Sequence, residues 1–283
     1  MSLSCLVVLY RKKLSDCSTL NSIIGFDSYG VLSSLTVWDN SPSPQNPDEI
    51  NKFKLLFSEI GIEFNYTNHP ENTPLSKIYN LFLDREKFKS KYILILDDDS
   101  KLDSTFLSKL SFALNSSVNY DLVLPIVKYK NRIISPSKRI LMKGAFYKNI
   151  NPGPISSRYL SAINSGMTIS TEYLIKSGFK YDERLTSYGT DDQFITSFSK
   201  NKGKAFIIDY NLEHDLTLSM LNKNSNILQE RYLEMTSSWL IVFGKNRLSR
   251  FFIRIYMAAH SFSTSIRFND FSYFICTLKK LFK

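Results

Sequence analysis

The sequence predicts an α/β protein with a mainly parallel β-sheet flanked by helices and a helical region appended at the C-terminus. Apolar runs of strand length alternate with amphipathic runs of helix length from the start of the chain to about residue 127. That order is typical of βαβ units with right-handed crossovers. The 283 residues are 43% hydrophobic, which is enough for a large core.

The first half of the chain is expected to hold five strands and four helices. Asn46-Pro47 begins the second helix, because Asn is a favoured cap and Pro suits the first turn, and Gly61 ends it. Either Asp103 or Ser104 caps the fourth helix. The predicted strands are 3–10, 32–38, 62–66, 92–96 and 121–127, and the predicted helices are 14–24, 47–60, 75–85 and 104–114.

The pattern changes after residue 127. Residues 128–157 are basic, contain Pro and Gly and lack a clear period, which indicates a hairpin or a mobile loop over a site. Regularity returns at 161–170, and Ser170 opens a short helix that Gly178 ends. Thr190 is expected to cap a helix to about residue 201, and residues 205–209 form a further strand.

Three adjacent aspartates follow the apolar run Tyr92–Leu96. Alternate side chains of an extended chain share a face, so Asp97 and Asp99 can converge on one cation while Asp98 turns elsewhere, toward a ribose hydroxyl. Carboxylate ligands favour Mg²⁺ or Mn²⁺, ions that keep positions open for substrate phosphates. A plain acidic turn is the alternative.

Asp39 also follows a predicted strand, and ligands of parallel sheets bind beyond the carboxyl ends of the strands. An ionised carboxylate only accepts hydrogen bonds, so Asp39 suits the N3–H of uracil or thymine and points to a UDP- or dTDP-linked ligand. Turn formation by Asp39-Asn40-Ser41-Pro42 is the alternative.

A second acidic pair, Asp191 and Asp192, lies in the first turn of a predicted helix. The helix macrodipole alone favours acids there. If the pair faces a site, one carboxylate can take the proton of an attacking hydroxyl while the other binds the acceptor. His214, between acids after a strand, is a candidate third metal ligand, although a lone histidine is more often structural.

The C-terminal region is basic and amphipathic. Residues 244–283 hold eight Lys or Arg against one acid, Asp270, which gives +7 of the total formal charge of +10. A helix here is either interfacial or docked on the rest of the protein. Its arginines Arg247, Arg250 and Arg254 share one face, opposite Leu248, Phe251, Phe252, Ile255, Ala259 and Phe262.

The composition also limits partners and location. No zinc-finger spacing, RNP-like motif or basic zipper occurs, so we expect no nucleic acid, and an anionic membrane surface or acidic glycolipid is the better partner. We read no signal peptide, no apolar run reaches ~18 residues, and three scattered cysteines form no disulfide framework. These features indicate a cytoplasmic protein, peripheral on the inner face of the plasma membrane if the tail binds lipid.

Across residues 4–217 the order of features resembles the family 2 inverting glycosyltransferases of GT-A type. The spacing of Asn72 and Asn80 matches the family pattern Asn-x-Gly-x5-Asn, except that Pro74 replaces the glycine. Asp97-Asp98-Asp99 is similar to the DxD metal motif, and Thr190-Asp191-Asp192-Gln193-Phe194 resembles the motif that carries the catalytic base. The other matching segments are Val7-Val8-Leu9-Tyr10-Arg11, Val37-Trp38-Asp39-Asn40-Ser41 and Asn164-Ser165-Gly166.

The resemblance implies roles for these positions. Asp192 would be the base, Asp97 and Asp99 would bind Mn²⁺ or Mg²⁺, and His214 matches a metal-binding histidine of rhamnosyl- and galactofuranosyl-transferase-like members. The implied acceptor-binding residues are Asp191, Asn164, Ser165 and Gly166, and the implied nucleotide-sugar-binding residues are Leu9, Tyr10, Arg11, Asp39, Asn72, Lys77, Asn80 and Asp98.

The expected function is metal-dependent, inverting transfer of a sugar from a UDP- or dTDP-sugar to a saccharide or lipid-linked glycan, in bacterial O-antigen, capsule or other surface polysaccharide. The expected domains are a catalytic domain over 1–217, divided into a nucleotide-sugar half (1–127) and an acceptor half (128–217), and a helical region over 218–283. Two alternatives are a sugar nucleotidyltransferase and a non-catalytic glycan-binding module. The first normally needs a glycine-rich basic loop after the first strand, and the paired acids would be superfluous in the second.

Overall fold

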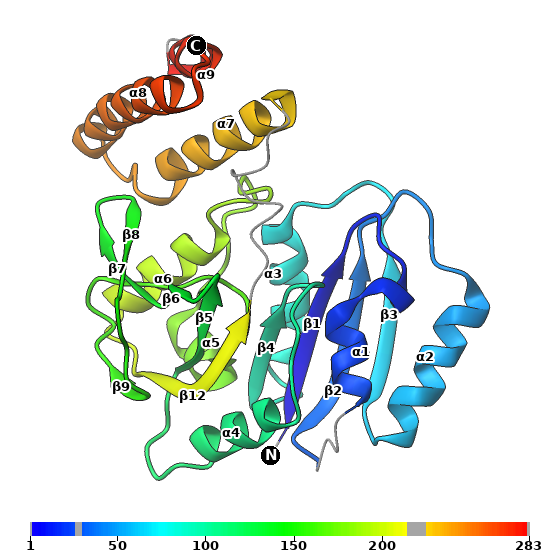
Figure 1. The fold of residues 1–283 in the computed structure, drawn as a ribbon. Coiled ribbons are helices and arrows are strands. Elements are labelled where there is room, and N and C mark those ends of the chain that lie inside the picture. The colour runs from blue at the N-terminus through cyan, green and yellow to red at the C-terminus, as the bar shows by residue number, and fades with distance from the viewer. Residues whose placement is uncertain (1, 26–29, 214–224, 282–283) are drawn as a thin grey trace.

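The computed structural model describes residues 2–25, 30–213 and 225–281 (Figure 1). Strands and helices alternate as predicted over the first half of the chain. This half contains β1 (Leu3–Leu9), the 3-10 helix η1 (Leu14–Asp16), α1 (Ser18–Ile24), β2 (Leu32–Asp39), α2 (Pro47–Glu59), β3 (Glu63–Asn68), α3 (Leu75–Glu86), β4 (Tyr92–Leu96), α4 (Thr105–Leu114) and β5 (Leu122–Tyr129).

The second half begins with short strands and ends with three helices. The irregular basic stretch forms four of these strands, of which β7 and β8 make the predicted hairpin. Its elements are β6 (Arg132–Ser135), β7 (Ser137–Ile140), β8 (Lys143–Phe146), β9 (Gly153–Ile155), β10 (Leu160–Ser161), β11 (Met167–Ser170), α5 (Thr171–Ser177), α6 (Thr190–Lys200), β12 (Ala205–Glu213), α7 (Ser225–Val242), α8 (Arg247–Phe268) and α9 (Ser272–Leu281).

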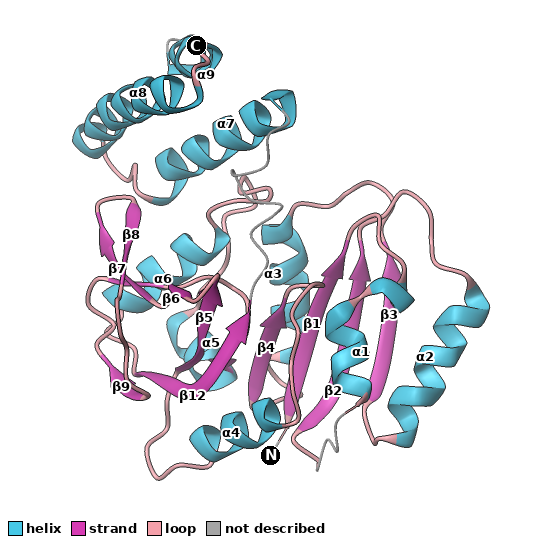
Figure 2. Ribbon diagram, in the orientation of Figure 1, coloured by secondary structure: helices cyan, strands magenta, loops and turns pink. Residues whose placement is uncertain are grey.

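One large sheet organises the molecule, with the strand order β3-β2-β1-β4-β11-β5-β12-β9 and β6 paired to β5 (Figure 2). The pairs among β1, β2, β3 and β4 are parallel, as is the pair of β5 and β12. β11 is antiparallel to both of its neighbours, β4 and β5. The predicted mainly parallel α/β fold is therefore confirmed.

Apolar side chains cover both faces of this sheet. Along β4, Tyr92, Leu94 and Leu96 join one core cluster, while Ile93 and Ile95 join the other. This alternation follows from the two-residue period of a strand, and it makes all five positions buried. The first cluster takes side chains from α1, α2 and α4, and the second takes them from α3, α5 and α6.

Several element boundaries follow the predicted chemistry. The Asn46 side chain accepts a hydrogen bond from the backbone N–H of Asp48, as a helix cap should. At α4 the capping side chain is Asp103 rather than Ser104, because Asp103 Oδ1 accepts from Thr105 N at 2.8 Å. The cap predicted at Thr190 is wrong: left-handed Gly189 precedes α6, and Thr190 is its first helical residue.

The C-terminal helices pack on one another, on α6 and on the turn between β7 and β8. Figure 1 shows them at the end of the molecule to which β1–β4 point. The apolar packing joins Trp239 of α7 to Ile253 and Met257 of α8, and Met142, between β7 and β8, contacts the same cluster. None of the helices in the described ranges combines the length and the apolarity needed to cross a bilayer.

The loop that enters α6 is fastened to α7. Glu234 of α7 accepts hydrogen bonds from the Thr186 hydroxyl and from the Ser187 N–H. Gly189 lies so close to α7 that a Cβ there would be 2.7 Å from Ser238 Cβ. The start of α6 is therefore held by the C-terminal helices as well as by the sheet.

Gly166 allows β11 to approach β5. Its φ is +78°, its N–H donates to Ile95 O at 2.9 Å, and an added Cβ would lie 2.6 Å from Pro125 Cγ. We expect Gly166→Ala to lower the free energy of unfolding by at least about 2 kcal/mol, from a left-handed alanine plus a steric clash. Urea unfolding measures the change.

The matched control is Gly61→Ala, since Gly61 has φ +74° but no atom within 4 Å of an added Cβ. It should cost only the backbone term of about 1 kcal/mol. Equal losses in the two variants would contradict the close approach at Gly166.

Candidate active site

The antiparallel direction of β11 places residues 164–166 at the carboxyl edge of the sheet. Because β11 runs against β4, its amino end meets the carboxyl end of β4, where Asp97 follows Leu96. The Ser165 hydroxyl donates a hydrogen bond to Asp97 Oδ2. Two segments that are far apart in the sequence thus meet at one carboxylate.

The same loop contacts the start of α6. Asn164 Nδ2 donates to Thr190 Oγ1 at 3.1 Å, and Asp191 and Asp192 follow in the first helical turn. Asp191 Oδ1 accepts from the N–H of Asp192 at 2.8 Å, which gives a partner to one of the first-turn amides that have none within the helix. The predicted residues Asp97, Asn164, Ser165, Asp191 and Asp192 therefore lie in one neighbourhood.

Tyr79 of α3 lies beside both acidic segments. Its hydroxyl is 3.5 Å from Asn164 Nδ2. Burial raises the pKa of the Tyr79 hydroxyl, and the charges of Asp97 and Asp191 raise it further. This tyrosine therefore stays a neutral hydrogen-bonding group in the floor of the site.

The pKa values of Asp191 and Asp192 are both raised above the ordinary range. Burial is the main cause for each, and Asp191 is raised further by Asp192 and by Asp97. The positive charge of Arg139 opposes the rise at Asp192. A carboxylate that binds protons more readily than a free aspartate suits general base catalysis near neutral pH.

Arg139 of β7 is a site residue that the sequence analysis missed, as it missed Tyr79. Its guanidinium donates to Thr196 Oγ1 and to Leu160 O, the latter at 2.8 Å, and Thr196 in turn donates to Asp192 O. The sequence did show that residues 128–157 are basic, but this charge did not distinguish Arg139 from the other cations of the stretch.

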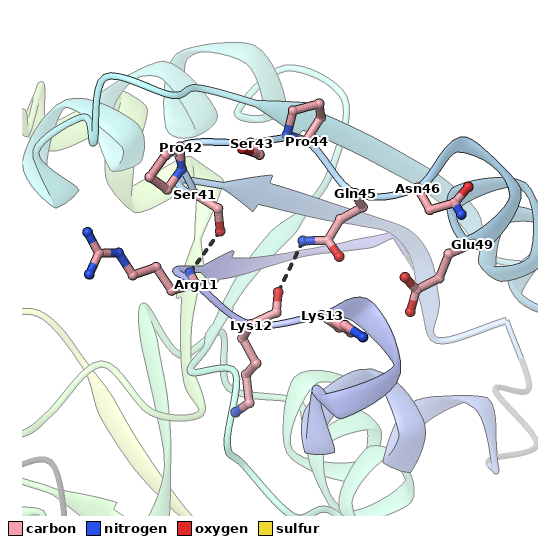
Figure 3. A pocket seen from close by; sticks show the side chains of 10 residues that line it. All are labelled: Arg11, Lys12, Lys13, Ser41, Pro42, Ser43, Pro44, Gln45, Asn46 and Glu49. Atoms are coloured by element: carbon pink, nitrogen blue, oxygen red, sulfur yellow. Dashed lines mark hydrogen bonds between the residues drawn. The ribbon is translucent and has the colours of Figure 1, made fainter.

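A cleft of about 690 Å³ opens at the same edge between the loops after β1 and β2 (Figure 3). Lys12 lies 3.4 Å from Asp98 Oδ1, so Asp98 turns to this lysine while Asp97 turns to Ser165. The ten lining residues are Arg11, Lys12, Lys13, Ser41, Pro42, Ser43, Pro44, Gln45, Asn46 and Glu49. Three cations against one acid make the cleft suitable for an anion.

Asp39 organises one wall of this cleft. Its side chain is fully buried and accepts from Ser41 N at 2.9 Å, from Gln45 Nε2 at 2.8 Å and from the Tyr66 hydroxyl at 2.7 Å. Gln45 also donates to Lys12 O, which links the two loops, as Figure 3 shows. A nucleobase that donated a hydrogen bond to Asp39 would have to share this carboxylate with the three donors of the protein.

Leu9 and Tyr10 lead into the first loop. Leu9 is buried and its carbonyl accepts from Asn40 N at 2.8 Å. Tyr10 is exposed, and its ring lies under the guanidinium of Arg11, 5.2 Å from the ring centre. The Arg11 N–H donates to the Ser41 hydroxyl.

The residues of the Asn-x-Gly-x5-Asn pattern separate in space. Asn72 Oδ1 accepts from Asn40 Nδ2 and so joins the loop after β2. Asn80 is buried, and its amide bonds both the N–H and the carbonyl of Tyr181, which ties α3 to the segment before α6. Lys77 is exposed on α3.

The predicted metal ligands are present in part. Asp97 and Asp99 are half-buried at the carboxyl edge of β4, while His214 lies outside the described residues. Within the described ranges no group of three His, Cys, Asp or Glu side chains is arranged around one point. One or two carboxylates do fit Mg²⁺ or Mn²⁺ bound together with substrate phosphates.

No family model matches the sequence, and no curated protein matches it either. Among solved structures, residues 1–349 of S. aureus TarS align with a TM-score of 0.55 and 14% identity, covering 88% of this chain and 73% of that one. GalNAc-T7, solved with UDP, GalNAc and Mn²⁺, aligns with a TM-score of 0.55 and 10% identity over 76% of this chain.

These neighbours are glycosyltransferases. The chain has the GT-A fold. It spans 44% of a longer TarS structure and 44% of GalNAc-T7. Identities of 10–14% show a common fold, and the activity is argued below from the site.

We expect Asp191→Asn to stabilise the protein at neutral pH by about 1–2 kcal/mol. The pKa of this carboxyl is higher in the folded than in the unfolded chain, so the wild type loses stability as the pH rises from the unfolded pKa, about 4, to the raised folded pKa. Asparagine keeps an Oδ1 to accept from Asp192 N. Below about pH 4 the wild-type carboxyl is neutral in both states, and the gain should vanish.

Urea unfolding at neutral and acidic pH tests this, with the exposed Asp209→Asn as the control, which should change stability by less than about 0.5 kcal/mol. Destabilisation by Asp191→Asn at neutral pH would contradict the raised pKa.

Proposed function

We propose that this chain is a metal-dependent inverting glycosyltransferase of the family 2 type, which moves a sugar from a UDP- or dTDP-activated donor to a saccharide hydroxyl. We place the reaction in the synthesis of a bacterial surface polysaccharide, with a saccharide or lipid-linked glycan as acceptor. The observation that carries the proposal is the meeting of Asp97 with Asp191 and Asp192 around residues 164–166, at the edge of a GT-A fold.

In the proposed reaction Asp192 takes the proton of the acceptor hydroxyl. The acceptor oxygen then bonds to the anomeric carbon from the face opposite the diphosphate, and the bond between that carbon and the diphosphate oxygen breaks. The bonding electrons leave with the nucleoside diphosphate, so the anomeric configuration inverts. Asp191, Asn164 and Ser165 orient the acceptor, and Arg139 keeps Asp192 ionised.

The basic cleft would bind the nucleotide diphosphate. Arg11 and Lys12 come from the loop after β1, and the loop after β2 forms the opposite wall. Asp97 and Asp99, with His214 as a further candidate, would hold Mn²⁺ or Mg²⁺. A divalent ion there supplies charge that stabilises the leaving diphosphate. Residues 1–217 would form the catalytic domain, with the nucleotide and acceptor halves divided at about residue 127.

A screen of nucleotide sugars tests the class of reaction. We expect at least one UDP- or dTDP-sugar to release its nucleoside diphosphate in the presence of Mn²⁺ or Mg²⁺, and chelation of the ion to stop the release. Pyrophosphate formation from a nucleoside triphosphate and a sugar phosphate would instead identify a nucleotidyltransferase. Binding of glycans without any turnover would identify a binding module.

Asp192→Asn should reduce turnover by about 10²-fold or more, because it removes the general base. Donor binding, measured by calorimetry with the nucleoside diphosphate, should be retained, since Asp192 does not line the cleft around Arg11. Asp209→Asn serves as the control with unchanged turnover. Full activity of Asp192→Asn would refute the assignment of the base.

Arg139→Gln should move the acidic limb of the pH–rate profile to higher pH. Asp192 must be ionised to accept a proton, and loss of the neighbouring positive charge raises its pKa further. Turnover would then fall at a less acidic pH than in the wild type. Arg139→Lys keeps the charge and should restore the position of the limb; an unshifted limb in Arg139→Gln would exclude an electrostatic role.

A further inference from the structure

α8 docks through a face that is not its apolar one. The side chains that it buries include Ile253 and Met257, but also Ser261, Thr264 and Ser265. The opposite side carries an outer stripe, which we define as Leu248, Phe251, Phe252, Ile255, Ala259, Phe262 and Ile266. At 100° per residue these seven positions fall within about 100° of one another around the helix.

The outer stripe is exposed along its whole length. Its six large side chains are between 46% and 66% exposed. At about 1.5 Å per residue the helix runs for roughly 33 Å, so the stripe is a long surface rather than a single protruding side chain. Phe271, the third residue after α8, extends the stripe, because the Phe271 and Phe262 ring centres are 6.3 Å apart and Phe271 is itself exposed.

Positive charges of α8 flank the outer stripe, and α8 itself carries no acid. Arg247 and Arg254 lie about 90–110° to one side of its centre and Arg267 about 110° to the other side. Neither α8 nor α9 contains Asp or Glu, and α9 adds Lys279 and Lys280. Asp270, between α8 and α9, accepts hydrogen bonds from Gln229 and Ser272.

We propose that the outer stripe of α8 binds an anionic lipid membrane surface, with the helix lying in the plane of the interface. Its apolar side chains would enter the boundary between headgroups and acyl chains, and the flanking arginines would reach lipid phosphates. A second copy of the chain fits less well. Symmetric pairing would bring the basic flanks together with no acid on either helix to meet them.

The position of the helix supports this occupant. Figure 1 shows α8 and α9 at the outer end of the molecule, beyond α7, where a flat surface can reach them without contact with the sheet. The docked face of α8 stays on its neighbours, since the His260 ring of α8 packs against Tyr232 and Trp239 of α7, and Tyr232 in turn packs against Tyr273 of α9. Membrane binding therefore requires no unfolding of the described structure.

Flotation of the full chain with lipid vesicles tests the proposal without any sugar substrate. We expect binding to phosphatidylcholine vesicles that contain phosphatidylglycerol, weakened by salt, and little binding to phosphatidylcholine alone. Phe251→Ser/Phe252→Ser should weaken binding at least about tenfold, through the loss of two buried rings. Replacing Arg247, Arg254 and Arg267 by Gln should weaken binding to the anionic vesicles by about fivefold for each arginine.

The matched control is Phe88→Ser/Phe112→Ser, which removes two exposed phenylalanines far from the C-terminal helices and should leave vesicle binding unchanged. Urea unfolding confirms that the variants are folded. Equal loss of binding in the control would show nonspecific adsorption and overturn the proposal. It would also be overturned if the wild type failed to bind anionic vesicles, or if Phe251→Ser/Phe252→Ser only converted a dimer to a monomer in light scattering.

Discussion

Three carboxylates lie close together at one edge of the sheet. Their mutual repulsion is the main constraint on the structure of the candidate site. Asp97 follows β4, whereas Asp191 and Asp192 lie in the first turn of α6, and burial raises the pKa of the latter two. The fold meets this cost with hydrogen bonds from Ser165 and from the α6 backbone and with one partly buried cation, Arg139. The buried carboxylates lower the free energy of unfolding, but their arrangement can exchange protons near neutral pH.

The reversed strand β11 makes the arrangement possible. In an all-parallel sheet only loops that leave the strands reach the carboxyl edge, whereas β11 brings an entering loop to it. Asn164 and Ser165 can then contact the end of β4 and the start of α6 at once. On the other side of β4, hydrogen bonds through Gln45 join the loops after β1 and β2 into one wall.

Sequence patterns predicted the strands, helices and caps that depend on neighbouring residues. They missed the contacts that depend on pairing between distant segments of the chain. The run at β4, its three acids and the cap at Asn46 follow from local period and chemistry. Arg139 lies near Asp192 only because β7 pairs with β8 and β10, a register that the irregular stretch does not reveal. Asn80 matched a motif, yet its amide bonds the Tyr181 backbone, and burial of this kind has no signature in one sequence.

The contacts of α7 with the loop before α6 affect how shortened forms of this protein would behave. Glu234 holds Thr186 and Ser187, and Ser238 abuts Gly189, one residue before the helix that carries the acidic pair. Deleting residues 218–283 would free that loop and expose Met142, which packs against Trp239, Ile253 and Met257 of the deleted helices. A truncated chain could therefore be inactive because the loop before α6 has lost its contacts, and not because a membrane-binding surface has been removed. Only full-length chains with substitutions on the outer face of α8 separate these two effects.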